Sequence, residues 1–287
     1  MNKNQKKVPV LITFLITIVG CVLFCSGDAV NKYYQIHIPD KNNVVENYSG
    51  FSKKDIDPDS IKILIWNVYK EQKQGWAHDF KKVSKGMDII LIQEACLKEN
   101  NKQMFCVNKM GWDFARSFLF RTKDLNETGV MTLSKIFPCS VDFIVTKFSE
   151  PFSRTPKVSL LNKYPVLNTK AKLLVVNIHG INFVGLNCFK SQIFELVKKI
   201  KLHKGPIVFA GDFNTWNYKR IFFLKKTLNN IGLKEIEFNP DLRTKRLGCF
   251  LDYAFYKGLK VKKTKVFNNI ISSDHKALYV EFYMEET

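Results

Sequence analysis

A strand-length apolar run that stops abruptly at polar residues constrains the fold of this chain more than any other feature. Residues Ile207–Ala210 are uninterrupted apolar residues, and Gly211, Asp212 and Asn214 follow them closely. Short apolar runs bounded by glycine are typical of buried strands. On an extended chain Asp212 and Asn214 point the same way, because they lie two residues apart. The sequence therefore indicates that the side chains at the end of this strand take part in catalysis. An Asp/Asn-rich strand end followed by a helix cap is the alternative interpretation.

The same pattern of an apolar strand followed by polar residues recurs along the chain. The other polar ends are Trp66-Asn67, Gln93-Glu94, Asn177-Ile178-His179, Leu251-Asp252-Tyr253 and Ser273-Asp274-His275. Each motif alone is weak, because a single histidine is more often a structural residue than a catalytic one. The ordered set is a much stronger signal than any of its members.

Strand-length and helix-length patterns alternate through residues 61–287. Helices are expected at Trp76–Ser84, Glu99–Lys109 and Tyr218–Asn229, and a further helix carries the apolar stripe of Ile193, Leu196, Val197 and Ile200. Strands are expected at Ile61–Trp66, Asp88–Ile92, Gly129–Leu133, Val141–Lys147, Lys157–Leu161, Leu173–Ile178, Leu233–Phe238, Leu251–Tyr256, Val261–Phe267 and Lys276–Phe282. Many strands with fewer helices favour two sheets that pack face to face and are covered by helices.

The N-terminal segment predicts a membrane helix. Lys3, Lys6 and Lys7 precede Val8–Cys25, a run of 18 residues without a charge. A helix of that length spans roughly 27 Å, enough to cross a bilayer core. We therefore expect residues 1–30 to form an apolar anchor with the catalytic domain exported. Cleavage of a signal peptide, or lipoprotein processing at Cys21, are the alternatives. Residues 31–60 are polar and predict a tether with little core of its own.

The charge balance indicates an anionic partner. Lys and Arg number 45 against 26 Asp and Glu, which leaves a net charge of +19. Such a field attracts polyanions, either nucleic acid or an anionic membrane surface. A lysine-rich composition that serves only solubility is the alternative, so charge alone does not select a substrate.

The cysteines suggest at most a limited disulfide framework. Seven are present, and two of them lie in the apolar segment, so the remainder is odd in number. In an exported domain Cys96 and Cys106 are the nearest candidate pair in sequence. Cys139, Cys188 and Cys249 are expected to be buried small residues. Neither a Cys-x-x-Cys motif nor a Cys/His cluster at zinc spacing occurs.

The ordered polar motifs resemble those of the endonuclease/exonuclease/phosphatase superfamily. That superfamily includes pancreatic-type deoxyribonucleases, apurinic endonucleases, sphingomyelinases and inositol-polyphosphate phosphatases. The resemblance extends from about Ile61 to Phe282, and Trp66–Gln72, Gly129–Ser134 and Val176–Phe183 look most similar to the poorly characterised bacterial YafD-like branch. It implies a four-layer α/β sandwich, in which two packed, mostly antiparallel sheets are flanked by helices and the strand-end loops gather at one rim.

The resemblance also implies a Mg²⁺-dependent phosphoric ester hydrolase, with Mn²⁺ as the alternative ion. Hard cations of this kind prefer oxygen ligands and keep much of their water. Glu94 is the first candidate ligand, and Asn67 would orient it or help a second ion. Asp274 is a further candidate, either as a metal ligand or as a scaffold acid.

The catalytic roles implied by the resemblance fall on five residues. Asp212 would activate a water molecule, and the Asp252 carboxylate would orient His275 and raise its basicity. His179 would donate to a phosphoryl oxygen or protonate the leaving oxygen. Asn214 would steady the pentavalent transition state.

Neighbouring residues supply candidate substrate contacts. Tyr69, Lys70 and Trp216 lie beside the catalytic motifs, although core packing explains the two aromatic residues equally well. The chain departs from the family at Ser134–Pro138, where many members have Ser-Arg-x-Pro. This segment is one residue longer and carries Lys135 at the arginine position. A bidentate arginine grip on phosphate is therefore not expected here.

Three functions remain open from the sequence. The favoured one is a nuclease-like phosphodiesterase, expected to be monomeric, that acts on nucleic acid outside the cytoplasm. The second is a phospholipid or sphingomyelin phosphodiesterase, or a phosphoinositide phosphatase, at a membrane whose anionic head groups suit a basic protein. The third is a non-catalytic binding protein, which the presence of the complete set of reactive residues makes the least favoured of the three.

Overall fold

Two mixed β-sheets form the centre of the protein. The computed structural model describes residues 36–99, 101–121 and 124–285. The larger sheet has the strand order β1 (Val45–Tyr48), β4 (Gly111–Arg121), β5 (Leu125–Ser134), β3 (Ile89–Leu97), β2 (Ile61–Asn67), β15 (Ala277–Tyr283) and β14 (Lys260–Phe267). The smaller sheet has the order β10 (Lys234–Glu235), β13 (Asp252–Lys257), β9 (Ile207–Asp212), β8 (Lys172–His179), β7 (Val158–Pro165) and β6 (Ser140–Val145).

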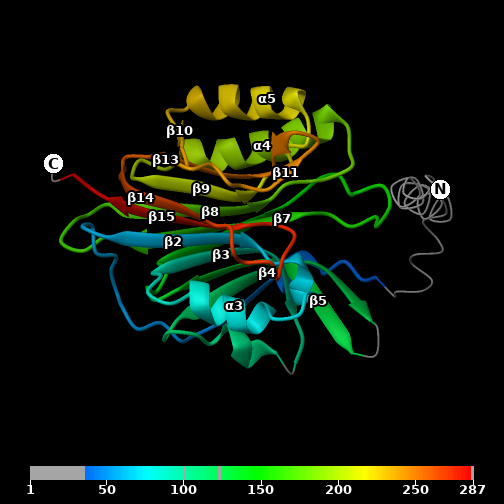
Figure 1. Ribbon diagram of the computed structural model, residues 1–287, viewed down its shortest axis with the longest axis horizontal. Helices are drawn as coiled ribbons and strands as arrows, with labels where there is room; N and C mark the ends of the chain where they lie inside the picture. The colour runs from blue at the N-terminus through cyan, green and yellow to red at the C-terminus, as the bar shows by residue number, and fades with distance from the viewer. Residues whose placement is uncertain (1–35, 100, 122–123, 286–287) are drawn as a thin grey trace, which may run out of the picture.

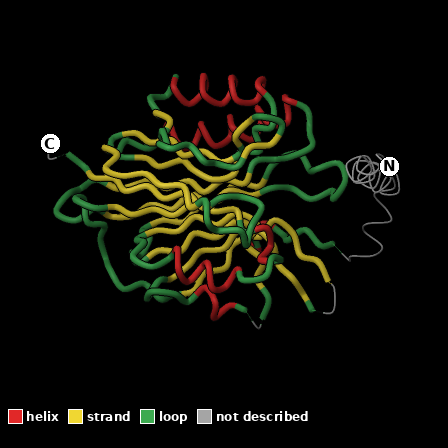
Figure 2. Tube along the Cα trace, in the orientation of Figure 1, coloured by secondary structure: helices red, strands yellow, loops and turns green. Residues whose placement is uncertain are grey.

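Helices cover the outer faces of both sheets. Helix α3 (Trp76–Val83) packs on the larger sheet, and α4 (Leu186–Lys201) and α5 (Tyr218–Asn229) cover the smaller one (Figures 1 and 2). Short 3-10 turns are η1 (Lys41–Asn43), η2 (Tyr69–Glu71) and η3 (Lys102–Phe105), and β11 (Lys245–Arg246) pairs with β12 (Cys249–Phe250). Within the two large sheets β2–β3 and β8–β9 are parallel and the other pairs are antiparallel. The result is two mixed sheets between helical layers.

Successive side chains of the central strands pack on opposite faces of the sheet. In β2, Ile63 and Ile65 lie in the core between the sheets, whereas Leu64 and Trp66 pack towards α3. Both faces of this strand are apolar because both are covered, as is usual for the central strands of such sandwiches. The exposed edge strand β14 instead carries lysines, which oppose pairing with another chain.

Several expected elements match the structure closely. Helix α5 has the predicted bounds, α3 differs at its last residue only, and the stripe of four apolar residues in α4 is buried. The helix expected at Glu99–Lys109 is wrong, since only η3 forms there. The strand expected at Leu233–Phe238 is reduced to β10.

The segment predicted as a polar tether contributes to the folded domain. Strand β1 pairs with β4 at the edge of the larger sheet, and Val44 and Ile56 are buried. The expectation that residues 31–60 have little core is therefore corrected for the residues described. The predicted N-terminal apolar helix lies outside the described residues, and within them no helix is long and apolar enough to cross a membrane.

The expected cysteine pair does not form. Cys96 and Cys106 are both free thiols, the first buried and the second exposed. Cys249 is buried as expected, but Cys139 is exposed and Cys188 is half-buried.

Candidate active site

The C-terminal ends of four strands bring the predicted polar residues together. Asn67 ends β2 and Glu94 lies in β3, whereas His179 ends β8 and Asp212 ends β9. Each of β2–β3 and β8–β9 is a parallel pair, with Asn67 opposite Gln93 and His179 opposite Asp212. The site therefore draws its side chains from both sheets.

Asp212 is the centre of the cluster. Its Oδ1 accepts a hydrogen bond from the Asn214 backbone N–H at 2.8 Å, and its Oδ2 accepts one from Asn67 Nδ2 at 3.0 Å. The Nε2 atoms of His179 and His275 lie 3.7 and 4.0 Å from the same Oδ2. Burial raises the pKa of Asp212 to about 7, although the nearby His275 opposes this shift. A carboxyl group with such a pKa can exchange protons near neutral pH.

The two histidines differ in protonation state. Burial, together with the ammonium group of Lys157, lowers the pKa of His179 well below its ordinary value. Burial also disfavours the charged form of His275, but the Asp252 and Asp212 carboxylates outweigh it and raise the pKa to about 10. His275 Nδ1 lies 2.8 Å from Asp252 Oδ2, which fixes the direction of Nε2. At neutral pH His179 is thus a neutral imidazole and His275 an imidazolium.

Glu94 occupies a β-bulge that aims its side chain into the cluster. The pairing of β3 with β5 shifts between Gln93 and Ala95, and Glu94 has a φ of 53°. Its Oε2 lies 2.6 Å from Lys70 Nζ, and its Oε1 lies 3.8 Å from His179 Nε2. Although burial disfavours the charged carboxylate, the Lys70 ammonium holds the pKa of Glu94 well below its usual range.

A left-handed turn presents Lys70 to Glu94. Tyr69, Lys70 and Glu71 have φ values of 51°, 52° and 59°, a conformation that costs about 1–2 kcal/mol per residue. Hydrogen bonds hold the turn: the Tyr69 N–H donates to Asn67 Oδ1 at 3.0 Å, and Glu71 Oε1 accepts from the Cys96 N–H at 2.8 Å. The strained backbone is thus fixed at both ends.

A buried arginine supports the loops beside the cluster. Arg220 in α5 donates to the backbone carbonyls of Ile181 at 2.8 Å, Asn214 at 2.9 Å and Val184 at 2.7 Å. Its guanidinium group lies 5.0 Å from the centre of the Trp216 ring. Burial lowers the pKa of Arg220 to about 10. This role could not be predicted from the sequence, because a single arginine in an amphipathic helix usually faces solvent.

An amide pair links the two sheets directly behind the cluster. Gln93 Nε2 donates to Asn177 Oδ1 at 2.7 Å, and Asn177 Nδ2 donates to the Met131 carbonyl at 2.9 Å. Both side chains are fully buried, so an unmade bond here would be costly. Both amides belong to the polar strand-end motifs of the sequence, but their role in connecting the sheets was not predicted.

Three of the predicted site residues lie at the edge of the cluster. Asp274 Oδ2 accepts a hydrogen bond from Arg246 Nη2 at 3.1 Å, and its Oδ1 is buried without a hydrogen-bond partner among the described residues. The Asp274 carboxylate also helps to raise the pKa of His275, although it is not part of the ligand group formed by Asp212, Asp252 and His275. Trp216 packs beside Arg220, and the Tyr69 ring lies 6.0 Å from Lys70 Nζ. The role of Asp274 as a metal ligand stays a prediction.

The donor set fits a hard divalent cation. Asp212, Asp252 and His275 offer ligand atoms that all lie within 4.8 Å of one another, but His275 could bind an ion only after losing its proton. Glu94 and Asp212 are joined through Asn67 Nδ2, which lies 3.4 Å from Glu94 Oε1 and 3.0 Å from Asp212 Oδ2. Carboxylate oxygens are the ligands that Mg²⁺ and Mn²⁺ prefer. Asn67 does not present an oxygen to this site, because its Oδ1 accepts from Tyr69 and its Nδ2 faces Glu94 and Asp212.

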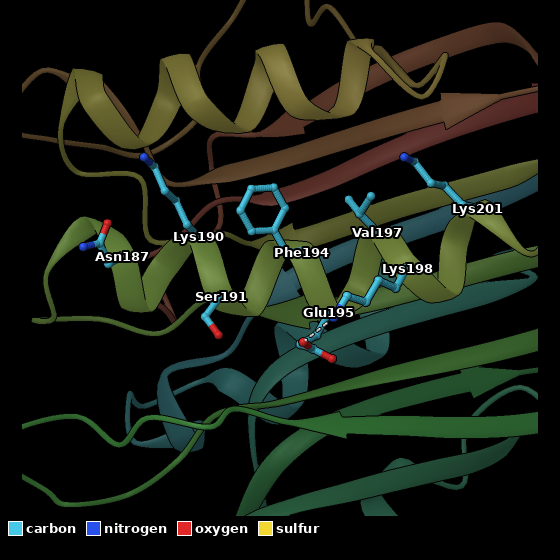
Figure 3. Close-up of a pocket in the computed structure, with 8 residues that line it drawn as sticks. All are labelled: Asn187, Lys190, Ser191, Phe194, Glu195, Val197, Lys198 and Lys201. Atoms are coloured by element: carbon cyan, nitrogen blue, oxygen red, sulfur yellow. Dashed lines mark hydrogen bonds and ion pairs between the residues drawn. The ribbon is translucent and has the colours of Figure 1, made fainter.

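Two hollows contrast in their chemistry. A cavity of about 210 Å³ is lined by Glu94, His179 and Lys70 and so opens onto the cluster. A wider hollow of about 540 Å³ follows α4, where Phe194 and Lys190 line it (Figure 3). None of the predicted site residues lines the hollow on α4, so the site belongs to the smaller cavity.

Acids, amides and histidines at one rim of a two-sheet sandwich define a hydrolase type of site. A model of the Endonuclease/Exonuclease/phosphatase family matches residues 64–275. The chain belongs to this family, which supports a phosphoesterase or nuclease type of activity. The family prediction made from the ordered motifs is confirmed.

Relatives and solved structures agree with this assignment. A UPF0294 protein of Vibrio vulnificus strain YJ016 is 35% identical over 247 residues, which cover 84% of each chain. An endonuclease/exonuclease/phosphatase family protein from Leptotrichia buccalis has a TM-score of 0.58 at 20% identity, covering 78% of this chain and all of its own. The human nocturnin catalytic domain with bound sulfate has a TM-score of 0.56 at 14% identity, covering 84% and 98%. These structures share the fold.

Proposed function

We propose that the chain is a divalent-metal-dependent phosphodiesterase that cleaves nucleic acid with an activated water molecule. The observation that carries this proposal is the setting of Asp212. Its buried Oδ2 lies 3.0 Å from Asn67 Nδ2 and within 4.0 Å of two histidines whose charge states differ. Pairs of titratable groups with pKa values pushed apart are typical of acid–base sites.

Each side chain of the cluster has a separate role in hydrolysis. Asp212 accepts the proton of the attacking water as the new P–O bond forms, and the opposite P–O bond breaks to release an alkoxide that takes a proton from solvent. Neutral His179 donates a hydrogen bond to a non-bridging oxygen. The His275 imidazolium, held by Asp252, stabilises the negative charge that accumulates on phosphorus oxygens.

The amides and Lys70 orient these groups. Asn67 and Asn214 both donate to Asp212, which keeps its carboxylate in one rotamer. Lys70 neutralises part of the charge of Glu94 and lies where a phosphate oxygen would approach. A bound Mg²⁺, or Mn²⁺ as the alternative, would be held by Glu94 and would polarise the phosphoryl group, which leaves Asp212 free to act as the base.

Nucleic acid is the favoured substrate because of charge. The net charge of +19 suits a polyanion, since phosphate contacts by lysine and arginine dominate nucleic-acid affinity. A neighbour of the same fold, nocturnin, holds a sulfate anion, which resembles phosphate in shape and charge. Both observations support a phosphate-rich substrate.

A lipid phosphodiester is the second candidate, and exposed aromatic residues favour it. Phe152 and Phe183 are 46% and 60% exposed, with ring centroids 5.8 Å apart. Their loops are joined by the hydrogen bond from the Asn182 N–H to Glu150 Oε1 beside the cavity. Exposed aromatic side chains at a site entrance suit a membrane interface as well as a nucleobase.

The proposal includes export of a monomeric catalytic domain, which the sequence alone supports. The uncharged run Val8–Cys25 follows a lysine-rich start, as in membrane anchors with the N-terminus inside. The anionic face of a membrane is therefore a secondary partner in the proposal.

Hydrolysis by the full-length chain in detergent tests the proposed function. The substrates are supercoiled plasmid, sphingomyelin vesicles and phosphoinositide vesicles, each with Mg²⁺, Mn²⁺ or chelator. Asp212→Asn should lower the rate at least about a hundredfold, the usual contribution of a general base. Asp142→Asn is the matched control and should retain the rate, because Asp142 pairs with Lys199 at the surface and does not line the cavity.

Each outcome distinguishes the candidates. Metal-dependent plasmid nicking that is lost in Asp212→Asn supports the nuclease. Cleavage of lipid with intact plasmid supports the second candidate and overturns the first. No hydrolysis of any substrate by the unmodified chain overturns the phosphodiesterase proposal as a whole.

A further inference from the structure

The cavity beside the cluster is a continuation of the active site. Glu94 and His179 form part of its lining, and the remaining walls come from β4, from β5 and from the loop that leads into β7. The cavity measures about 210 Å³. A substrate whose phosphate lies between His179 and Asp212 therefore extends into this space on one side.

Three of the four hydroxyl groups in the cavity walls form hydrogen bonds within the protein, and Thr128 supplies the fourth hydroxyl. Ser117 Oγ donates to the Pro156 carbonyl, which ties β4 to the loop opposite. The hydroxyls of Ser153 and Thr155 bond each other at 2.7 Å. These bonds fix the shape of the walls.

Lys157 and Lys70 are the lysines of the lining, and both have donors that their ion pairs leave unused. The Lys157 side chain is 13% exposed, and its Nζ lies 3.2 Å from Glu150 Oε2. An ammonium group has three donors, and Glu150 is its one ion-pair partner among the described residues. The other oxygen of Glu150 accepts from the Asn182 N–H at 2.9 Å, so the carboxylate is fixed in place. Lys157 can thus donate to a ligand in the cavity.

The lysines of the lining give the cavity donors for an anion. Lys70 pairs with Glu94 and Lys157 pairs with Glu150, so the lining is balanced as it stands. Each ammonium group keeps donors that its carboxylate partner does not use, and a phosphate can accept hydrogen bonds from them. The quaternary ammonium group of choline offers these donors no acceptor.

We infer that this cavity binds the phosphate next to the scissile one in a polynucleotide strand, and that Lys157 is the residue that contacts it. The inference rests on the proposed function, because it assigns the substrate's second phosphate to a neighbour of the same catalytic cluster. It makes Lys157 a specificity-determining residue that distinguishes a phosphate chain from an isolated diester.

Binding of two mononucleotides by the full-length chain tests this inference. Thymidine 3′,5′-bisphosphate carries the second phosphate and thymidine 5′-monophosphate lacks it, and titration calorimetry with Mg²⁺ and with chelator gives both affinities. The unmodified chain should prefer the bisphosphate about tenfold, the effect of one charge-assisted hydrogen bond. Lys157→Met should reduce this preference to about twofold or less.

Lys147→Met is the matched control. Lys147 also pairs with a glutamate, Glu195 at 3.2 Å, but its side chain is 65% exposed and lies outside the cavity lining. This variant should keep the full preference for the bisphosphate. Lys157→Gln, which keeps a polar side chain, serves as a second variant in case the methionine variant fails to fold.

The binding results test the role of Lys157, whereas the hydrolysis results test the proposed function. Equal affinity of the unmodified chain for the two nucleotides, or an undiminished preference in folded Lys157→Met or Lys157→Gln, overturns the role of Lys157. If the unmodified chain nicks plasmid under these conditions, the proposed function survives that result. Absence of any hydrolysis overturns the proposed function instead.

Discussion

Removal of the buried Arg220 guanidinium should destabilise the domain strongly. Its three hydrogen bonds to the carbonyls of Ile181, Val184 and Asn214 are bonds to a charged donor, which contribute about 1.5–3 kcal/mol each. Burial of the charge opposes them, and the pKa lowered from 12.5 to about 10 corresponds to about 3 kcal/mol. Three such bonds contribute about 4.5–9 kcal/mol, so the net loss expected for Arg220→Met is about 1.5–6 kcal/mol of unfolding free energy.

Urea denaturation followed by tryptophan fluorescence measures this loss. Trp216 lies 5.0 Å from the guanidinium group and so reports on the same region. Arg246→Met is the matched control, because Arg246 is exposed and its pair with Asp274 is worth about 0–1 kcal/mol. An unfolding free energy of Arg220→Met within about 1 kcal/mol of the unmodified chain would refute the reasoning.

Two further predictions concern the pH dependence of stability and the steric cost of a side chain at Gly211. Burial raises the pKa of Glu71 from 4.5 to about 8, so the unfolded carboxyl group ionises first as pH rises. The unfolding free energy should then fall between these pH values, by up to about 1.4 kcal/mol per pH unit. Urea midpoints of Glu71→Gln should show a flatter pH dependence, and an unchanged slope would exclude Glu71 as the titrating group. Gly211 has a φ of 141°, and a Cβ there would lie 2.1 Å from the Ile178 carbonyl oxygen. Gly211→Ala should therefore cost more than about 3 kcal/mol in thermal or urea unfolding, whereas the control Gly185→Ala, with open space around its Cβ, should cost only about 1 kcal/mol, because Gly185 is the N-cap of α4. Equal midpoints for the two alanine variants would contradict this steric argument.

Local patterns predicted the elements whose structure depends on local contacts. Helix α5 follows Asn217, whose side chain caps it by accepting from the Arg220 N–H, and its bounds were predicted correctly. The central strand β9 was predicted from its apolar run and ends at Asp212 as expected. These features depend on periodicity and capping, which a sequence shows directly.

The missed features depend on partners distant in sequence. The expected helix at Glu99–Lys109 is replaced by a short turn because Asn101 donates to Glu71 and to the Cys96 carbonyl. Strand β4 was not predicted, and its neighbours β1 and β5 lie on either side of it. Tertiary hydrogen bonds of this kind override local propensity.

The candidate site was predicted in its main residues but not in its arrangement. Motif order located Asp212 and both histidines, and the structure brings them within 4.0 Å. The sequence did not predict the hydrogen bond between Asp274 and Arg246, because Arg246 lies 28 residues away in the short strand β11. Lys157 was overlooked because nothing in a lysine-rich sequence distinguishes a half-buried lysine from an exposed one.

The site is divided between the two sheets, so catalytic activity reports whether the sheets have packed against each other. Asn67 and Glu94 belong to the larger sheet, and His179, Asp212 and Asp252 belong to the smaller one. Either sheet alone holds only part of the cluster, and the amide pair behind it forms only when the sheets meet. Secondary structure can therefore return before any catalytic competence does. Docking of the two sheets is therefore the step that assembles the complete cluster.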